Sequence, residues 1–333
     1  MPDLLLVGLV AAALLFDFMN GMNDAANSIA TIVSTRVLSP RYAVVWAAFF
    51  NFIAFLVFGQ QVAKTMGSGI VLTSIITDQV IFGALVGAIS WQLITWAAGI
   101  PSSSTHAMIG GLVGSAVAHA GTGVILWHGL GRTIVAIFLS PTLGMVLALV
   151  FMVITAWAFK HAVPGRVDTI FRRAQFFSAS MYSLGHGGND AQKTMGIIAA
   201  LLYAHGQIQG EFHIPLWVIL ACQTAMAAGT LGGGWRIVKT MGSRITHLSP
   251  YQGVCAESAG SVMLFAATAL GIPVSTTHTI TGAIVGVGAA KRASAVRWNV
   301  AKDIVQAWII TIPCSAAIAA AAYTLGHATS FFN

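Results

Sequence analysis

The chain alternates long apolar runs with short polar connections, and this pattern constrains its fold more than any other feature. Hydrophobic residues make up 57% of it and charged residues only 8%, whereas a soluble domain carries about 25% charged residues. A helix of about 20 residues crosses a bilayer core of about 30 Å. Runs of that order occupy residues 4–30, 43–62, 80–99, 133–159, 176–204, 214–234, 250–270 and 303–325. The sequence therefore predicts an all-α integral membrane protein.

Two further apolar runs, 102–118 and 274–289, are rich in glycine and somewhat short. If both cross the membrane, the chain has ten crossings, and the alternative is that they form re-entrant hairpins. The first run of the chain has only Asp3 and no basic residue ahead of it. A cleavable signal peptide starts with a basic segment, so we expect this run to be retained as the first helix.

The basic residues predict the orientation. With ten crossings and both termini outside, thirteen of the sixteen Lys and Arg residues lie in cytoplasmic loops, as membrane proteins prefer. Lys64 and Arg132 lie outside, and Lys193 lies within an apolar run. The net charge of +7 is therefore explained by the preference of basic residues for the cytoplasmic side of the lipid bilayer, and no nucleic-acid partner is needed. The three cysteines have no metal-binding or redox spacing, and no cofactor is expected.

An internal repeat divides the chain into two halves, 1–165 and 166–333. Each half holds five of the ten runs, an odd number, so the second copy is expected to be inverted in the membrane. Inverted repeats are a common plan of secondary transporters, whose sites lie near the midplane where broken helices or helical hairpins meet. The matching segments are "GMNDAANS" (21–28) with "GGNDAQKT" (187–194), "KTMGS" (64–68) with its copy at 239–243, and "GIPSSSTHAMIGGLVG" (99–114) with "GIPVSTTHTITGAIVG" (271–286).

Polar residues follow one face of the first predicted helix at a spacing of three, four and three positions. A charge in the middle of a bilayer costs several kcal/mol, so this face is expected to line the protein interior or a water-filled cavity. The four residues are Asp17, Asn20, Asp24 and Asn27, and their counterparts in the second half are Ser183, His186, Asp190 and Lys193.

The Asn-Asp pairs persist in both halves, as Asn23-Asp24 and Asn189-Asp190. Flanking glycines predict that each helix unwinds here and adds backbone carbonyls to the side-chain oxygens. Such hard oxygen ligands suit Na⁺, or a proton carried by the Asp. The alternative is structural, with Asp190 neutralised by Lys193, and we expect Lys193 to be a charge partner of Asp190 before it is an anion ligand.

Two Pro-Ser/Thr-His segments, "PSSSTH" (101–106) and "PVSTTH" (273–278), precede glycine-rich helical runs. Proline favours a helix start, and Ser or Thr favours the N-cap. Hydroxyls together with unpaired amides at a helix N-terminus form a site for a small anion. The alternative is that the hydroxyls bond back within their own helix. The candidate anion ligands are Ser103, Ser104, Thr105, Ser275, Thr276 and Thr277, with His106 and His278 expected to brace the turns.

Glu257 is the remaining acidic residue at membrane depth, and the corresponding position of the first half is Leu85. The candidate site is therefore not fully symmetric. Glu257 is a candidate for a coupling-ion or proton site, or for a structural partner.

The two Gly-x-Asn-Asp and two Gly-Ile-Pro-x-Ser-(Ser/Thr)-Thr-His motifs resemble those of the inorganic phosphate transporter (PiT) family along essentially the whole chain. The resemblance implies two inverted repeats around a central phosphate, and uptake of phosphate with Na⁺ or H⁺ across the plasma (inner) membrane. It implies that the six Ser and Thr residues above contact phosphate and that Asn23, Asp24, Asn189 and Asp190 hold the coupling ions. Glu257 matches an acidic position of the family's second repeat.

The residues and the resemblance together predict a symporter that works by alternating access and is not an enzyme. A sulfate or other oxyanion symporter and an anion channel share its physical features. An intramembrane enzyme would need one good nucleophile and base, whereas the duplicated motifs offer two weak candidates. The coupling ion, the stoichiometry and the oligomeric state stay open, with a homodimer among the options.

Overall fold

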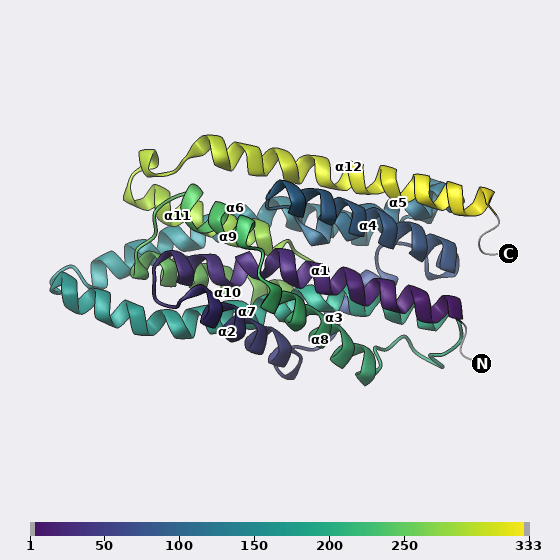
Figure 1. The fold of residues 1–333 in the computed structure, drawn as a ribbon, viewed down its shortest axis with the longest axis horizontal. Helices are drawn as coiled ribbons and strands as arrows, with labels where there is room; N and C mark the ends of the chain where they lie inside the picture. The colour runs from purple at the N-terminus through teal and green to yellow at the C-terminus, as the bar shows by residue number, and fades with distance from the viewer. Residues whose placement is uncertain (1–3, 330–333) are drawn as a thin grey trace.

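The computed structural model describes residues 4–329, which form an elongated bundle of helices (Figure 1). Of the residues, 83% are helical. Within residues 4–329 the only β-type pairing is an isolated bridge between Val71 and Ile125. The longest helices are α1 (Leu4–Ser34), α6 (Trp127–Ala158), α7 (Pro164–Ala204) and α12 (Trp298–Ala328). The all-α class predicted from the apolar runs is confirmed.

Shorter helices pack against the long ones. They are α2 (Pro40–Ile53), α3 (Gln61–Ser68), α4 (Asp78–Ala98), α5 (Ser104–Ala120), α8 (Leu216–Gly232), α9 (Trp235–Lys239), α10 (Pro250–Ala269) and α11 (Thr276–Lys291). Of these, α2, α3 and α8 lie along one outer edge of the bundle (Figure 1). Brief connecting segments are the 3₁₀ turns η1 (Ala54–Leu56), η2 (Thr73–Ile75), η3 (Thr122–Val124) and η5 (Ala293–Ala295), and the π-helical η4 (Thr240–Arg244). Helices α2, α7 and α10 begin with proline, whose fixed φ suits the first helical turn.

Four of the described helices, α1, α4, α6 and α12, are long and apolar enough to cross a membrane singly. Two bent pairs qualify as well: α2 with α3 at 82°, and α8 with α9 and η4 at 64°. Large apolar side chains point outward from α6, among them Phe138, Val153 and Trp157. An apolar outer surface of this kind suits lipid rather than water.

Helices α1 and α7 stay α-helical through both Asn-Asp pairs, so the predicted unwinding is wrong. The glycines serve close helix packing instead. A Cβ atom on Gly21 would lie 2.1 Å from the carbonyl oxygen of Met226 in α8, and one on Gly187 would lie 2.5 Å from that of Asn51 in α2. Any larger residue would push these helices apart.

The chain breaks at the tips of two helical hairpins, α4–α5 and α10–α11. Gly99 and Gly271 each take φ +67°, a left-handed conformation that glycine adopts without strain. The hairpins enter the bundle from opposite ends, and their tips meet near its middle (Figure 1). The runs 102–118 and 274–289 therefore start in the middle of the molecule.

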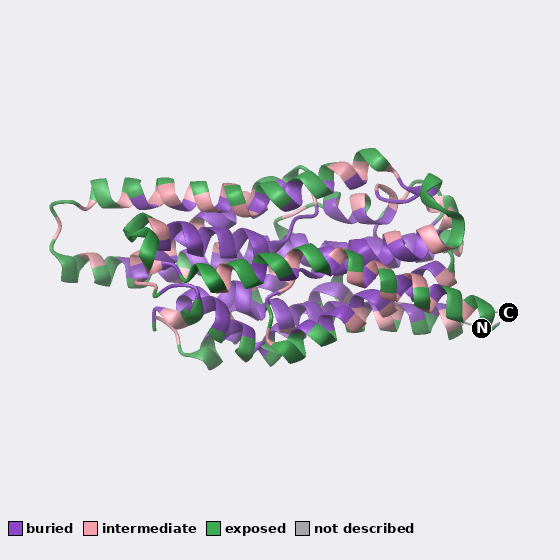
Figure 2. Cartoon of the chain, turned by 90° about the horizontal axis from the view of Figure 1, so that it is seen from above, coloured by how far each residue is buried: buried purple, intermediate pink, exposed green. Residues whose placement is uncertain are grey.

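Buried residues concentrate in the middle of the bundle, and exposed residues lie on the outer faces and at the ends (Figure 2). Two apolar clusters form this core. One contains the start of α1, up to Phe16, and the end of α7, from Ala191; the other contains the end of α1, from Ala26, and Tyr182 of α7. The Asn-Asp pairs lie where the two clusters meet.

Helix α1 begins and α12 ends at the same end of the molecule, opposite the α6–α7 connection (Figure 1). At that opposite end, Arg172 Nη1 donates to the carbonyl oxygen of Arg36 at 3.3 Å. The backbone N–H of Arg297 donates to the carbonyl oxygen of Ile245 at 2.9 Å, beside Arg244. Basic connections are thus gathered at one end, as the sequence predicts, and the side of the membrane that this end faces stays a prediction.

Candidate functional site

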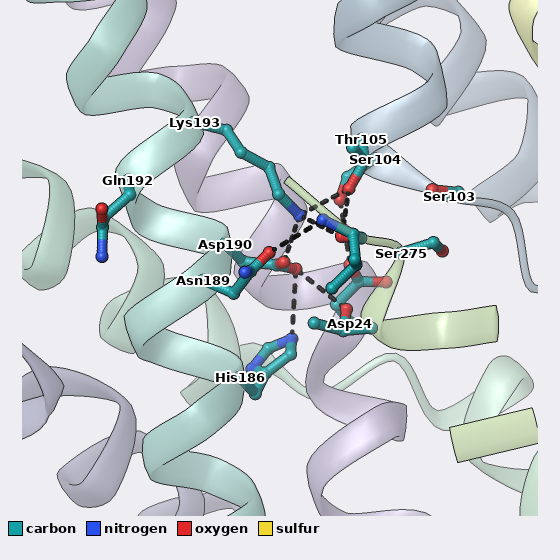
Figure 3. Close-up of polar contacts among 12 residues, drawn as sticks. Asp24, Ser103, Ser104, Thr105, His186, Asn189, Asp190, Gln192, Lys193 and Ser275 are labelled. Atoms are coloured by element: carbon teal, nitrogen blue, oxygen red, sulfur yellow. Dashed lines mark hydrogen bonds and ion pairs between the residues drawn. The ribbon is translucent and has the colours of Figure 1, made fainter. Parts of the chain in front are cut away.

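The aspartates of the two Asn-Asp pairs lie in one buried cluster with the starts of α5 and α11 (Figure 3). Ser104 Oγ donates to Asp24 Oδ2 at 3.1 Å. Thr276 Oγ1 donates to Asp190 Oδ2 at 3.0 Å. Asp24 and Asp190 are 166 positions apart, and Ser104 and Thr276 are 172 apart. The two bonds are therefore counterparts within the repeat.

A second pair of counterpart contacts crosses from each half to the hairpin of the other. Asn27 Nδ2 on α1 donates to Thr277 Oγ1 on α11 at 2.9 Å. Lys193 Nζ on α7 donates to Thr105 Oγ1 on α5. Asn27 and Lys193 share one repeat position although their chemistry differs. The two positions therefore make the same contact with the opposite hairpin, but the second half carries a positive charge there and the first half does not.

The hairpin tips also bond to each other. Thr105 Oγ1 donates to the carbonyl oxygen of Val274 at 2.9 Å, and Thr277 Oγ1 shares its single proton between Asp24 Oδ1 at 3.2 Å and the carbonyl oxygen of Ser102 at 3.3 Å. The two bonds to backbone carbonyls are again counterparts, since both pairs of positions differ by 172. The two tips are therefore joined symmetrically by side-chain hydroxyls and backbone carbonyls.

Lys193 is buried and its ammonium group has three acceptors, which is its full hydrogen-bonding capacity. It forms an ion pair with Asp190, donates to Thr105, and donates to the carbonyl oxygen of Val274 at 3.0 Å. One ammonium faces the carboxyl groups of Asp24 and Asp190. With both carboxyl groups ionised, the cluster carries one uncompensated negative charge, which a bound cation would neutralise.

His186 belongs to this cluster, although the sequence analysis placed it on the polar face without giving it a role. Its Nε2 lies 3.4 Å from Asp190 Oδ2, and its Nδ1 lies 3.2 Å from Asn51 Oδ1. One ligand atom each from Asp24, His186 and Asp190 lies within 4.8 Å of the others. The three side chains together could therefore hold a cation. The sequence feature that could have predicted this contact was the i, i+4 spacing of His186 and Asp190.

The two asparagines of the pairs differ in their contacts. Asn189 Nδ2 donates to Thr268 Oγ1 at 3.0 Å, and Asn189 Oδ1 accepts from the backbone N–H of Val274 at 3.3 Å. These bonds attach α7 to the α10–α11 hairpin. Asn23 Oδ1 has no hydrogen-bond partner within residues 4–329, and it borders a cavity of about 10 Å³ beside Gln92.

Of the six predicted anion ligands, four converge on the cluster and two do not. Ser103 Oγ accepts from the backbone N–H of His106 at 3.2 Å, and Ser275 Oγ accepts from that of His278 at 3.2 Å. Both serines are N-caps, and among the residues drawn no dashed line joins either of them to the aspartates (Figure 3). The rings of His106 and His278 contact each other, with centroids 4.4 Å apart. The residues that converge are Ser104, Thr105, Thr276 and Thr277.

Glu257 lies in a separate buried cluster that the sequence analysis did not assemble. Thr31 Oγ1 donates to Glu257 Oε1 at 2.6 Å, Gln175 Nε2 donates to the same oxygen at 2.9 Å, and Ser178 Oγ donates to Oε2. Thr31 lies seven residues after Asp24, on the same face of α1. That spacing could have pointed to Thr31. Gln175 and Ser178 could be assigned to Glu257 only from the packing of α7 against α10.

A cavity of the described residues lies away from the polar cluster. It has a volume of about 460 Å³, lies between α6, α11 and α12, and is bordered mainly by apolar side chains, with His106, His278 and Trp308 at its edge. A surface of this kind offers few donors to an anion. At Asp24 the residual cavity is only about 10 Å³. A tetrahedral anion therefore enters only when hydroxyls now bonded to the carboxylates move apart.

A bundle with an apolar outer surface and paired ionisable groups buried where two hairpin tips meet is characteristic of a membrane transport protein. The chain belongs to the phosphate transporter family, whose model matches residues 20–319. It is therefore a transporter rather than an enzyme.

Individual relatives cover nearly the whole chain. A probable low-affinity inorganic phosphate transporter of Rhizobium meliloti (strain 1021) is 64% identical over 319 residues, with 96% of each chain covered. A protein of the same description from Bacillus subtilis (strain 168) is 44% identical over 322 residues, again with 96% of each covered. A solved structure described as the sodium-dependent phosphate transporter superposes with a TM-score of 0.90 at 25% identity, covering 97% of this chain and 99% of that one.

Proposed function

We propose that the protein is a secondary active transporter that carries inorganic phosphate together with Na⁺ or H⁺ across the plasma (inner) membrane. The observation that carries this proposal is the central cluster, in which Asp24 and Asp190 are bonded to hydroxyls at two facing helix starts. Acidic groups that bind cations thus touch the groups best suited to bind an anion. Family membership and the names of the relatives support phosphate as that anion.

Phosphate is proposed to bind between the two hairpin tips. The first amides of a helix have no intrahelical partners, and the positive end of the helix dipole favours an anion. Ser104 and Thr105 offer hydroxyls from α5, and Thr276 and Thr277 offer their counterparts from α11. Ser103 and Ser275, which we first expected to contact phosphate, are proposed to hold the helix starts in position.

The coupling cation is proposed to bind at the aspartates. Asp24 and Asp190 supply carboxylate oxygens, and Asn23 adds an amide oxygen that is free in the described residues. Asn189 is proposed to link this site to the α10–α11 tip, because its amide is bonded there. Asn20, Asn27 and Lys193 support the site. Glu257 is proposed as a separate cation or proton position.

Alternating access is proposed to follow from two inverted repeats, 1–165 and 166–333. The counterpart contacts across the cluster support the repeat, and the opposite directions of α1 and α7 support its inversion (Figure 1). Each half would contribute three crossings and one re-entrant hairpin, in place of the ten crossings first predicted. Three is still an odd number, so the inversion and the outside position of both termini are retained, with the basic loops in the cytoplasm.

The experiment is uptake of labelled phosphate into proteoliposomes under an imposed Na⁺ or H⁺ gradient. We expect one of the two gradients to drive phosphate uphill, and replacement of Na⁺ by choline at fixed pH distinguishes them. Asp24→Asn is the inactive control. Uptake that responds to neither gradient contradicts coupling, and flux that never runs uphill indicates an anion channel. Strong competition by unlabelled sulfate would instead support an oxyanion symporter of broader or different specificity.

A further inference from the structure

A fourth buried carboxyl, Asp17, lies on α1, outside both the central cluster and the Glu257 cluster. The side chain of Asp17 is 0% exposed, and neither of its carboxyl oxygens has a hydrogen-bond partner within residues 4–329. It precedes Asp24 by seven residues, two helical turns or about 10 Å, on the same helix face. The mechanism proposed above gives it no role.

The surroundings of Asp17 are polar but do not satisfy it. Thr194 on α7, Asn20 on α1 and the Cys222 thiol on α8 lie beside its carboxyl group and interact with it, but none of them meets hydrogen-bond geometry with its oxygens. Both amide atoms of Asn20 and the hydroxyl of Thr194 are also buried without partners in the part of the chain that the structure describes. A carboxyl, an amide and a hydroxyl thus lie together, each with unused hydrogen-bonding capacity.

Such an arrangement is costly unless something binds there. A buried donor or acceptor without a partner costs about 1–3 kcal/mol, and an uncompensated buried charge costs more. One cation among these oxygens would satisfy the carboxyl of Asp17, the amide oxygen of Asn20 and the hydroxyl of Thr194 at once. Carboxylate, amide and hydroxyl oxygens are hard ligands, and a single carboxylate balances a single positive charge.

The second half has no equivalent carboxyl. The counterparts of Asp17 and Thr194 are Ser183 and Ser28, whose hydroxyls are likewise without partners in residues 4–329. The aspartate of this repeat position therefore occurs only on the side of the cluster nearer the start of α1, whereas Glu257 lies on the other side, beside Thr31. In the predicted orientation, the side that holds Asp17 is the outward side.

We propose that Asp17, Asn20 and Thr194 form a third cation site, which holds Na⁺ on the outward side of the central cluster. This inference rests on the proposed function in taking Na⁺ as the coupling cation. An ion held at Asp17 lies two helical turns from Asp24. The site therefore acts as an outer binding site, which binds Na⁺ before the central cluster binds phosphate.

The test is equilibrium binding of ²²Na⁺ to the purified full-length protein at saturating phosphate. We expect Asp17→Asn, which preserves the shape of the side chain, to bind one Na⁺ fewer per protein than the wild type. Ser183→Ala is the matched control from the other half, and we expect it to bind the wild-type number. Thr194→Ala removes one oxygen and should weaken Na⁺ binding several-fold, which keeps the proposal testable if Asp17→Asn fails to fold.

Equal Na⁺ binding by Asp17→Asn and wild type would overturn the proposal. So would the absence of Na⁺ binding to the wild type, and in that case phosphate uptake driven by a proton gradient would leave the proposed function intact. Conversely, loss of one Na⁺ in Asp17→Asn combined with no phosphate uptake by the wild type would support the site and refute the proposed function. The two ideas can therefore fail separately.

Discussion

The two Asn-Asp pairs hold the same positions on α1 and α7, yet they are fixed by different forces. Asp190 faces a lysine and a threonine, and Asn189 is bonded to the adjacent hairpin tip. Asp24 is held by two hydroxyls, and Asn23 Oδ1 borders a small cavity. Asp190 in the second half is thus held by a charged partner, whereas Asp24 in the first half is held by weaker, neutral hydrogen-bond donors. We expect the α4–α5 hairpin to open at lower cost than the α10–α11 hairpin.

The largest effect is expected from Asp190→Asn, which leaves the ammonium of Lys193 buried without its counter-charge. Removal of one partner of a buried ion pair costs about 3–5 kcal/mol. We expect a large fall in thermal stability in detergent and complete loss of phosphate uptake. Asp24→Asn should abolish coupled uptake with little change in stability, because its partners are neutral hydroxyls.

The control for this contrast is Asp190→Asn combined with Lys193→Met, which removes the whole pair. It should recover much of the stability lost in the single variant and none of the uptake. Equal destabilisation by Asp24→Asn and Asp190→Asn would contradict the difference between the two halves.

Alanine at Gly21 or Gly187 should have the next largest effect, and a similar one in both halves. The added methyl group would overlap a backbone carbonyl of the neighbouring helix. Overpacking of this kind costs about 1–3 kcal/mol, even though alanine is the better helix former. Thermal unfolding measures the loss. Gly165→Ala, on the exposed start of α7 with nothing within 4 Å, is the matched control and should be neutral or slightly stabilising.

Asn27→Ala should have a smaller effect that tests the crossing contact of the first half. It removes the hydrogen bonds to Thr276 and Thr277, at 3.3 Å and 2.9 Å. A buried neutral hydrogen bond contributes about 1 kcal/mol, so we expect a modest loss of stability and several-fold slower uptake. Lys193→Ala should be far more damaging at the equivalent position. Similar losses in the two variants would show that charge is not what distinguishes the halves.

The smallest effects are expected from Ser103→Ala and Ser275→Ala. Each serine caps its helix through a bond of 3.2 Å, and loss of such a cap costs about 1 kcal/mol. Because the geometry is the same, the two losses of stability should be equal. A clear inequality, measured by thermal unfolding, would place part of the asymmetry in the helix starts rather than at the aspartates.

Local patterns in the sequence were enough to predict most of the helices, the helix starts of α5 and α11, and several residues of the central cluster, but not His186. Proline with Ser or Thr defines a helix start by its own conformational preference, so the caps at Ser103 and Ser275 could be expected. The 3, 4, 3 spacing on α1 placed Asp24 and Asn27 on one face, and the repeat identified their counterparts.

What the sequence did not predict depends on packing between distant segments. Glycine beside an Asn-Asp pair is compatible with unwinding and with close packing, and only the neighbouring backbones of Met226 and Asn51 decide between them. The different bonding of Asn23 and Asn189 could not be read from identical motifs. The partners of Glu257 come from α1 and α7, and no spacing rule connects Gln175 to it.

For the proposed cation-coupled transporter, the bonds between the hairpin tips would limit leakage of ions through the empty protein. Thr105 donates to the carbonyl oxygen of Val274, and Thr277 donates to that of Ser102, so parting the tips breaks one hydrogen bond in each direction. If the two broken bonds together cost about 1–3 kcal/mol, the parted conformation is populated about one to two orders of magnitude less than the closed one. Without substrates to compensate for these bonds, the pathway stays shut most of the time. The resting ion gradient is then dissipated only slowly.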